Sequence, residues 1–151
     1  MKKTIKLALI LLLVLSCNSK EKKSTKVNYP EKTSLIQKDP NLKASLERGK
    51  LVYDDLCITC HMANGKGATK IFPPLAGSDY LQQNQEKSIL GIKNGMSGTM
   101  VVNGVTYNSV MAPLGLSDEE VADVMNYINN SWGNEYGEFL STQDVTNVIE
   151  K

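Results

Sequence analysis

The sequence DDLCITCHMANGKG, residues 54–67, holds the pattern from which the rest of the chain can be interpreted. Two cysteines stand two residues apart, and a histidine directly follows the second: Cys57, Cys60 and His61. His61 is the only histidine among the 151 residues, and Cys17 is the only other cysteine. Any chemistry of this stretch therefore uses one imidazole and two neighbouring thiols.

Cys-x-x-Cys-His is the attachment signature of c-type haem. The thiols add across the two vinyl groups on one edge of the porphyrin, and the next residue places an imidazole beneath the iron. One turn of helix meets both needs, and residues 45–61 predict a helix through apolar steps at Leu46, Gly49, Tyr53 and Leu56. The sequence thus predicts one haem c, covalent through Cys57 and Cys60, with His61 as the proximal ligand.

Two other uses of these residues are weaker. A structural zinc site needs four ligands, whereas the stretch offers two thiols and one imidazole. A thioredoxin-like redox pair belongs in a βαβ setting, which the sequence around residues 50–70 does not predict. Haem attachment is therefore the preferred interpretation, and it leaves no cysteine for a disulfide if Cys17 is used elsewhere.

The sixth iron ligand cannot be a second histidine of this chain. Methionine is a soft donor that favours ferrous iron and raises the potential. Met62 directly follows His61, so it cannot reach the opposite face of the haem. Met125 falls on the apolar face of a helix that the capping box of Ser117 and Glu120 opens, where it is predicted to fill the core.

Three methionines remain for the sixth position. Residues 99–111, TMVVNGVTYNSVM, predict a short β-hairpin near 99–108 about their Asn-Gly turn. Met100 then belongs to a strand and Met96 to the glycine-rich loop before it. Met111 stands in an extended segment and is the predicted ligand. The alternative is that Met111 is a core residue and the iron is open, as in a ligand sensor.

From about Leu42 to its end, the chain resembles class I c-type cytochromes. The motifs that carry the likeness are CITCH, FPPLAGS (72–78) and VNGVTYNSVMAPLGLSDEEVADVMNYINNSWGN (102–134). The similarity is to single-haem modules known as free electron carriers and as domains fused to oxidases and nitrite reductases. It implies a mainly α cytochrome c fold, with three or more helices wrapped around one covalently bound haem.

The resemblance also assigns roles to residues. Pro73 matches the family proline whose carbonyl accepts the Nδ1 proton of the proximal histidine, and Leu75 matches a leucine that packs on the haem. Without the family resemblance, the alternative is that Pro73 is a plain loop breaker with no role at the haem. One departure concerns the sixth ligand: relatives commonly have Met-Pro-Pro, whereas Ala112 follows Met111 here and loosens the ligand loop.

Two further helical features are expected. By the resemblance, Gly49 and Tyr53 of the first helix cross the helix that carries Tyr127, where glycine permits close approach. Ser141, three residues before Asp144 and ahead of an apolar face, predicts a short terminal helix that packs back on the domain.

The N-terminus has the basic and apolar regions of a signal peptide, and its nine-residue apolar run is too short to span a bilayer. VLSC (14–17) resembles a bacterial lipobox, although Val14 and Leu15 depart from the usual pattern. This resemblance implies a lipid on Cys17 and an exported, membrane-anchored protein facing the periplasm or cell exterior. The alternative is an ordinary signal peptide cut nearby. The predicted organisation is a signal peptide (1–16), a lipid-anchored flexible linker (17–43) and a cytochrome c domain (44–151).

Charge divides along the chain. Residues 18–45 carry seven lysines against three acidic residues, whereas residues 46–151 carry seven basic and thirteen acidic residues. An acidic domain gives no support to nucleic-acid binding. The basic linker is suited to an anionic membrane surface or is simply solvated.

The function follows from the predicted site. An iron with both axial positions filled has nowhere to bind a substrate, and with His61 on the iron no histidine base remains. The sequence therefore predicts a monomeric electron carrier rather than an enzyme, working by outer-sphere transfer between membrane-associated redox proteins. The alternatives are a haem-based ligand sensor or peroxidase-like module, and a haem subunit of a larger oxidase or reductase complex.

Overall fold

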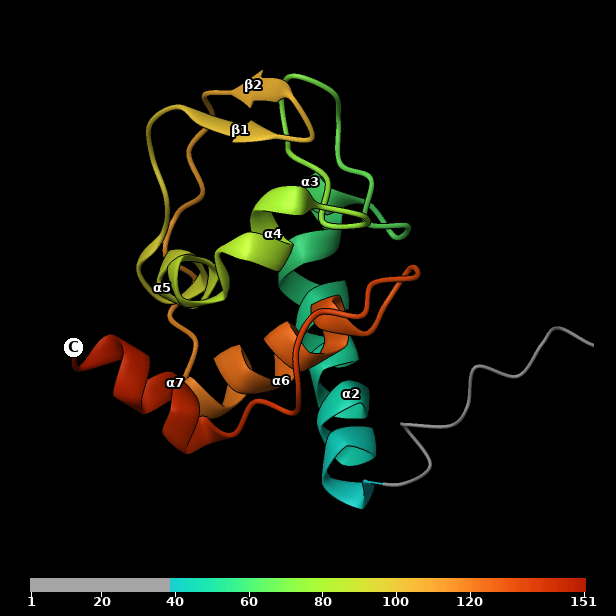
Figure 1. Ribbon diagram of the computed structural model, residues 1–151, viewed down its shortest axis with the longest axis vertical. Helices are drawn as coiled ribbons and strands as arrows, with labels where there is room; N and C mark the ends of the chain where they lie inside the picture. Colours follow the sequence, from blue (N-terminus) through green and yellow to red (C-terminus); the bar gives the residue numbers. More distant parts are fainter. Residues whose placement is uncertain (1–38) are drawn as a thin grey trace, which may run out of the picture. The chain divides into compact units, whose positions relative to one another are not determined.

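The computed structural model describes residues 39–151, so the predicted signal peptide, Cys17 and most of the predicted linker lie outside the described residues. The described chain is mainly helical with one two-stranded antiparallel sheet (Figure 1), which confirms the expected fold class. No helix among residues 39–151 has the length and apolar character needed to cross a membrane. In chain order the elements are α2 (Pro40–Val52), the π-helical turn η1 (Tyr53–Cys57), α3 (Ile58–His61), α4 (Asp79–Gln83), α5 (Gln85–Asn94), β1 (Met100–Val102), β2 (Val105–Tyr107), α6 (Asp118–Asn129) and α7 (Thr142–Ile149).

Helix α2 begins four residues earlier than the predicted start of the domain at residue 44. The Asp39 carboxylate accepts hydrogen bonds from the backbone N–H groups of Asn41 and Leu42, at 2.8 and 3.3 Å. Pro40 occupies the first helical position, where its fixed φ suits the helix and its missing N–H costs nothing. Leu42 is buried. The last residues assigned to the linker are therefore part of the folded domain.

This helix start predicts how far the chain can be shortened. A holoprotein beginning at Lys38 should keep the wild-type melting temperature, because it retains the Asp39 cap. A holoprotein beginning at Leu42 should lose about 1 kcal/mol, as N-cap removal does, and melt several degrees lower. Thermal unfolding of both forms measures the difference, and Asp39→Ala in the longer form should reproduce most of it. Equal melting temperatures would contradict the assigned cap.

The π-helical turn η1 joins α2 to α3 and changes the helical register just before the haem-binding pattern. The backbone N–H of Ile58 bonds to the carbonyl of Tyr53, five residues back. Such a turn is wider than an α-helical one, so the residues inside it are rotated away from the α-helical period. Tyr53 is fully buried as predicted, but Leu56 is 43% exposed. Leu56 therefore does not share the buried position of Tyr53 and instead belongs to the lining of a cavity.

Helix α2 crosses α6 at Gly49, as the family resemblance implied (Figure 1). A Cβ atom at Gly49 would lie 1.9 Å from the carbonyl oxygen of Asp123, so no side chain fits at this point. The buried Asp123 carboxylate accepts hydrogen bonds from Arg48 at 2.6 and 2.7 Å and from the Ser45 hydroxyl at 2.6 Å. The crossing is thus fixed both by close backbone approach and by a satisfied buried charge.

Helix α6 supplies half of the buried residues of the main hydrophobic cluster. Its side chains at Val121, Val124 and Met125 are fully buried, so Met125 is a core residue as predicted. Ser117 and Glu120 form the expected capping box at the start of α6. A second capping box, of Ser141 and Asp144, opens the predicted terminal helix α7, which packs on this core through Val145, Val148 and Ile149.

The predicted hairpin is confirmed. Strands β1 and β2 pair antiparallel, with Met100 opposite Tyr107. Asn103 and Gly104 form the turn with φ values of 51° and 74°, as a type I′ turn requires. The turn is attached to the start of α4, because Asp79 and Asn103 exchange side chain-to-backbone hydrogen bonds of 2.7 and 3.0 Å.

Trp132, the only tryptophan of the chain, lies just beyond α6 and packs against the loop that follows His61. Its indole Nε1 donates a hydrogen bond to the Ala63 carbonyl at 3.0 Å, and its ring centre lies 5.1 Å from that of Tyr53. Gly65, with φ of +66°, passes so close that a Cβ atom would lie 2.5 Å from the indole ring. The loop is therefore held against the end of α6.

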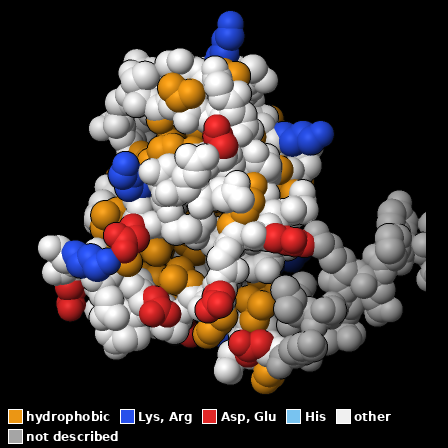
Figure 2. Space-filling view, viewed as in Figure 1, with side chains coloured by type: hydrophobic (Ala, Val, Ile, Leu, Met, Phe, Trp, Pro, Cys, Tyr) orange, Lys and Arg blue, Asp and Glu red, His pale blue; other side chains and the backbone are white. Residues whose placement is uncertain are grey.

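The surface of the described domain is mixed. Figure 2 shows apolar side chains in separate patches on one face, with acidic and basic side chains between them. The most exposed large apolar residues are Val110, Leu51 and Ile71.

Candidate haem site

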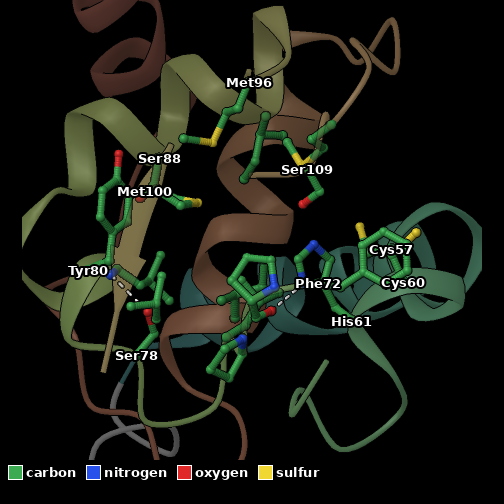
Figure 3. Close-up of a pocket in the computed structure, with 18 of the residues that line it drawn as sticks. Cys57, Cys60, His61, Phe72, Ser78, Tyr80, Ser88, Met96, Met100 and Ser109 are labelled. Carbon is green, nitrogen blue, oxygen red and sulfur yellow. Dashed lines mark hydrogen bonds between the residues drawn. The ribbon is translucent and has the colours of Figure 1, made fainter. Parts of the chain in front are cut away.

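A cavity of about 320 Å³ lies among the segments that sequence analysis singled out (Figure 3). Its lining brings together all six predicted haem-binding residues: Cys57, Cys60, His61, Pro73, Leu75 and Met111. Most other lining side chains are apolar and come from the loop at residue 72, from α5, from the hairpin and from the segment that follows β2, among them Phe72, Ile92, Val102 and Leu114. An apolar cavity with two thiols and one imidazole at its wall fits a covalently held haem.

His61 is oriented as an iron ligand must be. Its Nδ1 lies 3.0 Å from the carbonyl oxygen of Pro73, the contact that the resemblance implied. A carbonyl can only accept, so Nδ1 carries the proton and Nε2 keeps its lone pair for a metal. Figure 3 shows the ring with its second nitrogen directed into the cavity. Burial lowers the pKa of His61, while the bond to Pro73 opposes this, and the neutral ligating form is favoured.

The two cysteines lie on the His61 side of the cavity and are not joined to each other (Figure 3). Both are partly buried. As a free thiol, Cys57 has its pKa raised to about 11, because burial and the neighbouring Cys60 disfavour the thiolate. Within residues 39–151, no three His, Cys, Asp or Glu side chains gather as a group that could hold a metal ion.

The methionines divide differently from the expectation. Met62, on the exposed surface, and Met125, in the core, stay outside the cavity lining, but Met96, Met100 and Met111 all belong to it. Membership of a loop and of a strand therefore does not distinguish Met96 and Met100 from Met111. Side chains alternate between the two faces of a strand, so strand membership does not keep a methionine from the cavity.

Packing separates these methionines better than secondary structure does. The Met96 sulfur rests against α5, because a Cβ atom added at Gly91 would lie 2.4 Å from it. Met96 and Met111 are paired through their backbones, with N–H to carbonyl distances of 2.8 and 2.9 Å. Gly95, with φ of +80°, lets this pairing form, since a Cβ there would lie 2.7 Å from the Met111 carbonyl oxygen. The Met111 backbone is thus fixed beside the cavity.

Several lining residues carried no signal in the sequence. Phe72 and Ile92 lie in the cavity wall, yet neither belongs to a spacing pattern that distinguishes a haem contact from an ordinary core residue. Tyr80, in α4, and Ser109, in the segment after β2, are likewise placed there only by the folding of the chain.

Comparison with known proteins matches this site. The cytochrome c family model covers residues 46–132. Cytochrome c-552 of Thermus thermophilus is 42% identical over 82 residues, which are 51% of this chain and 63% of that protein. The cytochrome c subunit of the quinone alcohol dehydrogenase of Gluconobacter oxydans is 31% identical over 125 residues, 77% of this chain and 26% of the subunit. The cytochrome c subunit of gluconate 2-dehydrogenase of Pantoea cypripedii is 30% identical over 105 residues, 68% of this chain and 24% of the subunit.

This chain spans less than two thirds of the length of each of these relatives. The family match nevertheless covers more than half of the chain and includes the cysteines, the histidine and all three cavity methionines. The chain belongs to the cytochrome c family, whose members bind haem c covalently.

Proposed function

We propose that this chain is a single-haem electron carrier in which Cys57 and Cys60 attach the haem and His61 and Met111 ligate its iron. The orientation of His61 carries the proposal: the Pro73 carbonyl engages Nδ1, while Nε2 faces an apolar cavity whose lining includes methionine thioethers.

When bound, the haem supplies the reversible one-electron chemistry of its iron. The bond to Pro73 fixes the tautomer of His61 and raises its basicity as a ligand. The apolar lining, including Leu75, excludes water and lowers the local dielectric constant. Leu56 and Val110 line the cavity and are 43% and 72% exposed, so a partner protein meets apolar surface at the cavity rim.

The cavity supports a carrier over a peroxidase-like module. Apart from His61, the lining holds no His, Asp, Glu, Lys or Arg side chain among the described residues. Peroxide cleavage needs a group that moves a proton at the open side of the iron, a role that His, Glu and Asp fill most often, and none of these except His61 belongs to this lining. The ligand-sensor alternative depends on whether Met111 occupies the sixth position, which the Met111 variant in the Discussion tests.

For the whole protein, we propose an exported, monomeric lipoprotein anchored through Cys17, with the lysine-rich segment that follows as its tether. The lipobox resemblance and the basic composition of residues 18–38 support this arrangement. The dehydrogenase cytochrome subunits among the relatives support a membrane-associated redox protein as partner. The alternative is that the chain works as a haem subunit of a larger oxidase or reductase complex.

Haem attachment tests the proposal directly. In protein produced with c-type maturation machinery, haem should stay on the polypeptide during acid–acetone extraction, and the pyridine haemochrome spectrum should indicate two thioethers. Cys57→Ala and Cys60→Ala should each leave one thioether and strongly reduce the holoprotein yield, because the cavity walls pack on the attached group. A wild-type protein whose haem is extracted would contradict the assignment.

Cys17→Ser is the matched control, since it also removes one thiol. It should leave both thioethers intact and release the protein from membranes. Incorporation of labelled fatty acid into this variant, or haem loss from it, would count against the role given to Cys17.

A further inference from the structure

The segment between β2 and α6, residues 108–116, forms one wall of the cavity, and we call it the Met111 strap. Figure 1 shows it running from the hairpin past α5 to the start of α6. It contributes five residues to the lining: Ser109, Val110, Met111, Ala112 and Leu114. Its position depends on the contacts it makes with α5 and the residues after it.

The middle of the strap is held by residues that follow α5. Met96 and Met111 exchange backbone hydrogen bonds of 2.8 and 2.9 Å. Pro113 lies against Gly95, where an added Cβ would come within 2.9 Å of the proline Cδ. These contacts fix the strap near Met111 but leave its far end, beyond Leu114, to be held by something else.

Lys93, in the last turn of α5, holds that far end. Its ammonium donates to the Leu116 carbonyl at 2.8 Å and to Asp118 Oδ1 at 2.7 Å. The Lys93 and Asp118 side chains are 26% and 27% exposed, so the pair is partly shielded from solvent. A charged donor makes stronger hydrogen bonds than a neutral one, and Lys93 joins the last residue of the strap to α6.

The terminal helix completes this arrangement. The Thr146 hydroxyl of α7 donates to Asp118 Oδ2 at 2.8 Å. The bond from Lys93, and then that from Thr146, lower the pKa of Asp118 and keep the carboxylate charged. Three helices, α5, α6 and α7, therefore meet at the end of the strap.

We propose that Lys93 is a positioning residue for the sixth ligand: by fixing the end of the strap at Leu116, it holds the Met111 thioether against the iron. The proposal rests on Met111 being that ligand. Lys93 acts through the backbone and does not itself enter the cavity lining.

The test uses the ferric holoprotein and cyanide as the probe. Cyanide must displace the thioether, so its uptake rate reports how often the strap opens. Lys93→Met keeps the length of the side chain and removes both bonds. It should take up cyanide about tenfold faster than wild type, as expected for losing a hydrogen bond to a charged group, and weaken the thioether charge-transfer band.

Two control variants separate the effect of the Lys93 contacts from the general effect of removing a positive charge. Lys93→Arg keeps the charge and the donors and should stay close to the wild-type rate. Lys151→Met removes a 2.6 Å ion pair that joins the residue at position 151, beyond α7, to Glu86 of α5 without touching the strap, and it should have no effect. If the Lys93–Asp118 ion pair only stabilises the fold, Lys93→Met would lower the melting temperature and leave the cyanide rate and the band unchanged. That result would overturn the proposal.

Failure of the premise gives a different result. If Met111→Ala keeps the band and the wild-type cyanide rate, Met111 is not the ligand, and both its assignment and the role of Lys93 fall, whereas the carrier function can still rest on another methionine of the cavity. If Met111→Ala loses the band but Lys93→Met behaves like Lys151→Met, the role of Lys93 alone is overturned. Should Lys93→Met not fold, Thr146→Val replaces it: faster cyanide uptake than wild type supports the proposal, and an equal rate overturns it.

Discussion

Met111→Ala is expected to abolish the weak charge-transfer band that a thioether on oxidised haem iron gives at the red end of the visible spectrum. The same variant should lower the reduction potential, because a soft donor that prefers ferrous iron is removed. It should also bind carbon monoxide promptly when reduced, since the sixth position becomes open. These effects are large because they concern a bond to the iron rather than the packing around it.

Met96→Ala and Met100→Ala are the control variants, and they control closely for the loss of a methionine side chain from the cavity. Both residues line the same cavity as Met111, so each variant changes the volume of the haem environment by a similar amount. We expect both to keep the band. Loss of the band in Met100→Ala instead would move the ligand to strand β1 and leave the carrier function intact. Prompt carbon monoxide binding by the wild type would favour the ligand-sensor alternative.

Gly49→Ala is expected to destabilise the holoprotein by about 2 kcal/mol, even though alanine is the better helix former by about 1 kcal/mol. The added Cβ would lie 1.9 Å from the Asp123 carbonyl oxygen, which is backbone and cannot rotate away. The helices would have to separate, which would disturb the bonds of Ser45 and Arg48 to Asp123. The melting temperature should fall by on the order of 10 °C.

Gly91→Ala provides the comparison. It is the same substitution in another helix, and its added Cβ would also meet an atom too closely, at 2.4 Å. That atom is the Met96 sulfur, in a flexible side chain that can change rotamer. The loss of stability should therefore be clearly smaller than for Gly49→Ala. If Gly49→Ala melts at or above the wild-type temperature, α2 and α6 do not cross as closely as the structure shows.

Local signals in the sequence predicted the elements well. The Asn103-Gly104 pair predicted the hairpin turn, and the two capping boxes predicted where α6 and α7 begin. The start of α2 could also have been found, because Asp39 followed by Pro40 is a helix-start signal, although both residues fall in the predicted linker. These features depend on residues that lie within a few positions of one another.

Features that depend on distant contacts were not predictable in this way. The π-helical turn alters the register at Leu56 without any Pro or Gly to indicate it. The presence of three methionines in one cavity depends on how the hairpin folds over α5. The Lys93 contacts join residues 23 and 25 positions apart that share no period. The sequence therefore predicted the attachment of the haem better than the support of its sixth ligand.

The packing of Trp132 has a practical consequence for spectroscopy. The chain has one tryptophan, and it is bonded to the loop that directly follows His61. Haem absorbs in the range in which tryptophan emits, so fluorescence of the folded holoprotein is quenched by energy transfer. Emission recovers only when unfolding carries Trp132 far from the haem. The native protein thus contains its own optical reporter of unfolding, with no dye or substitution required.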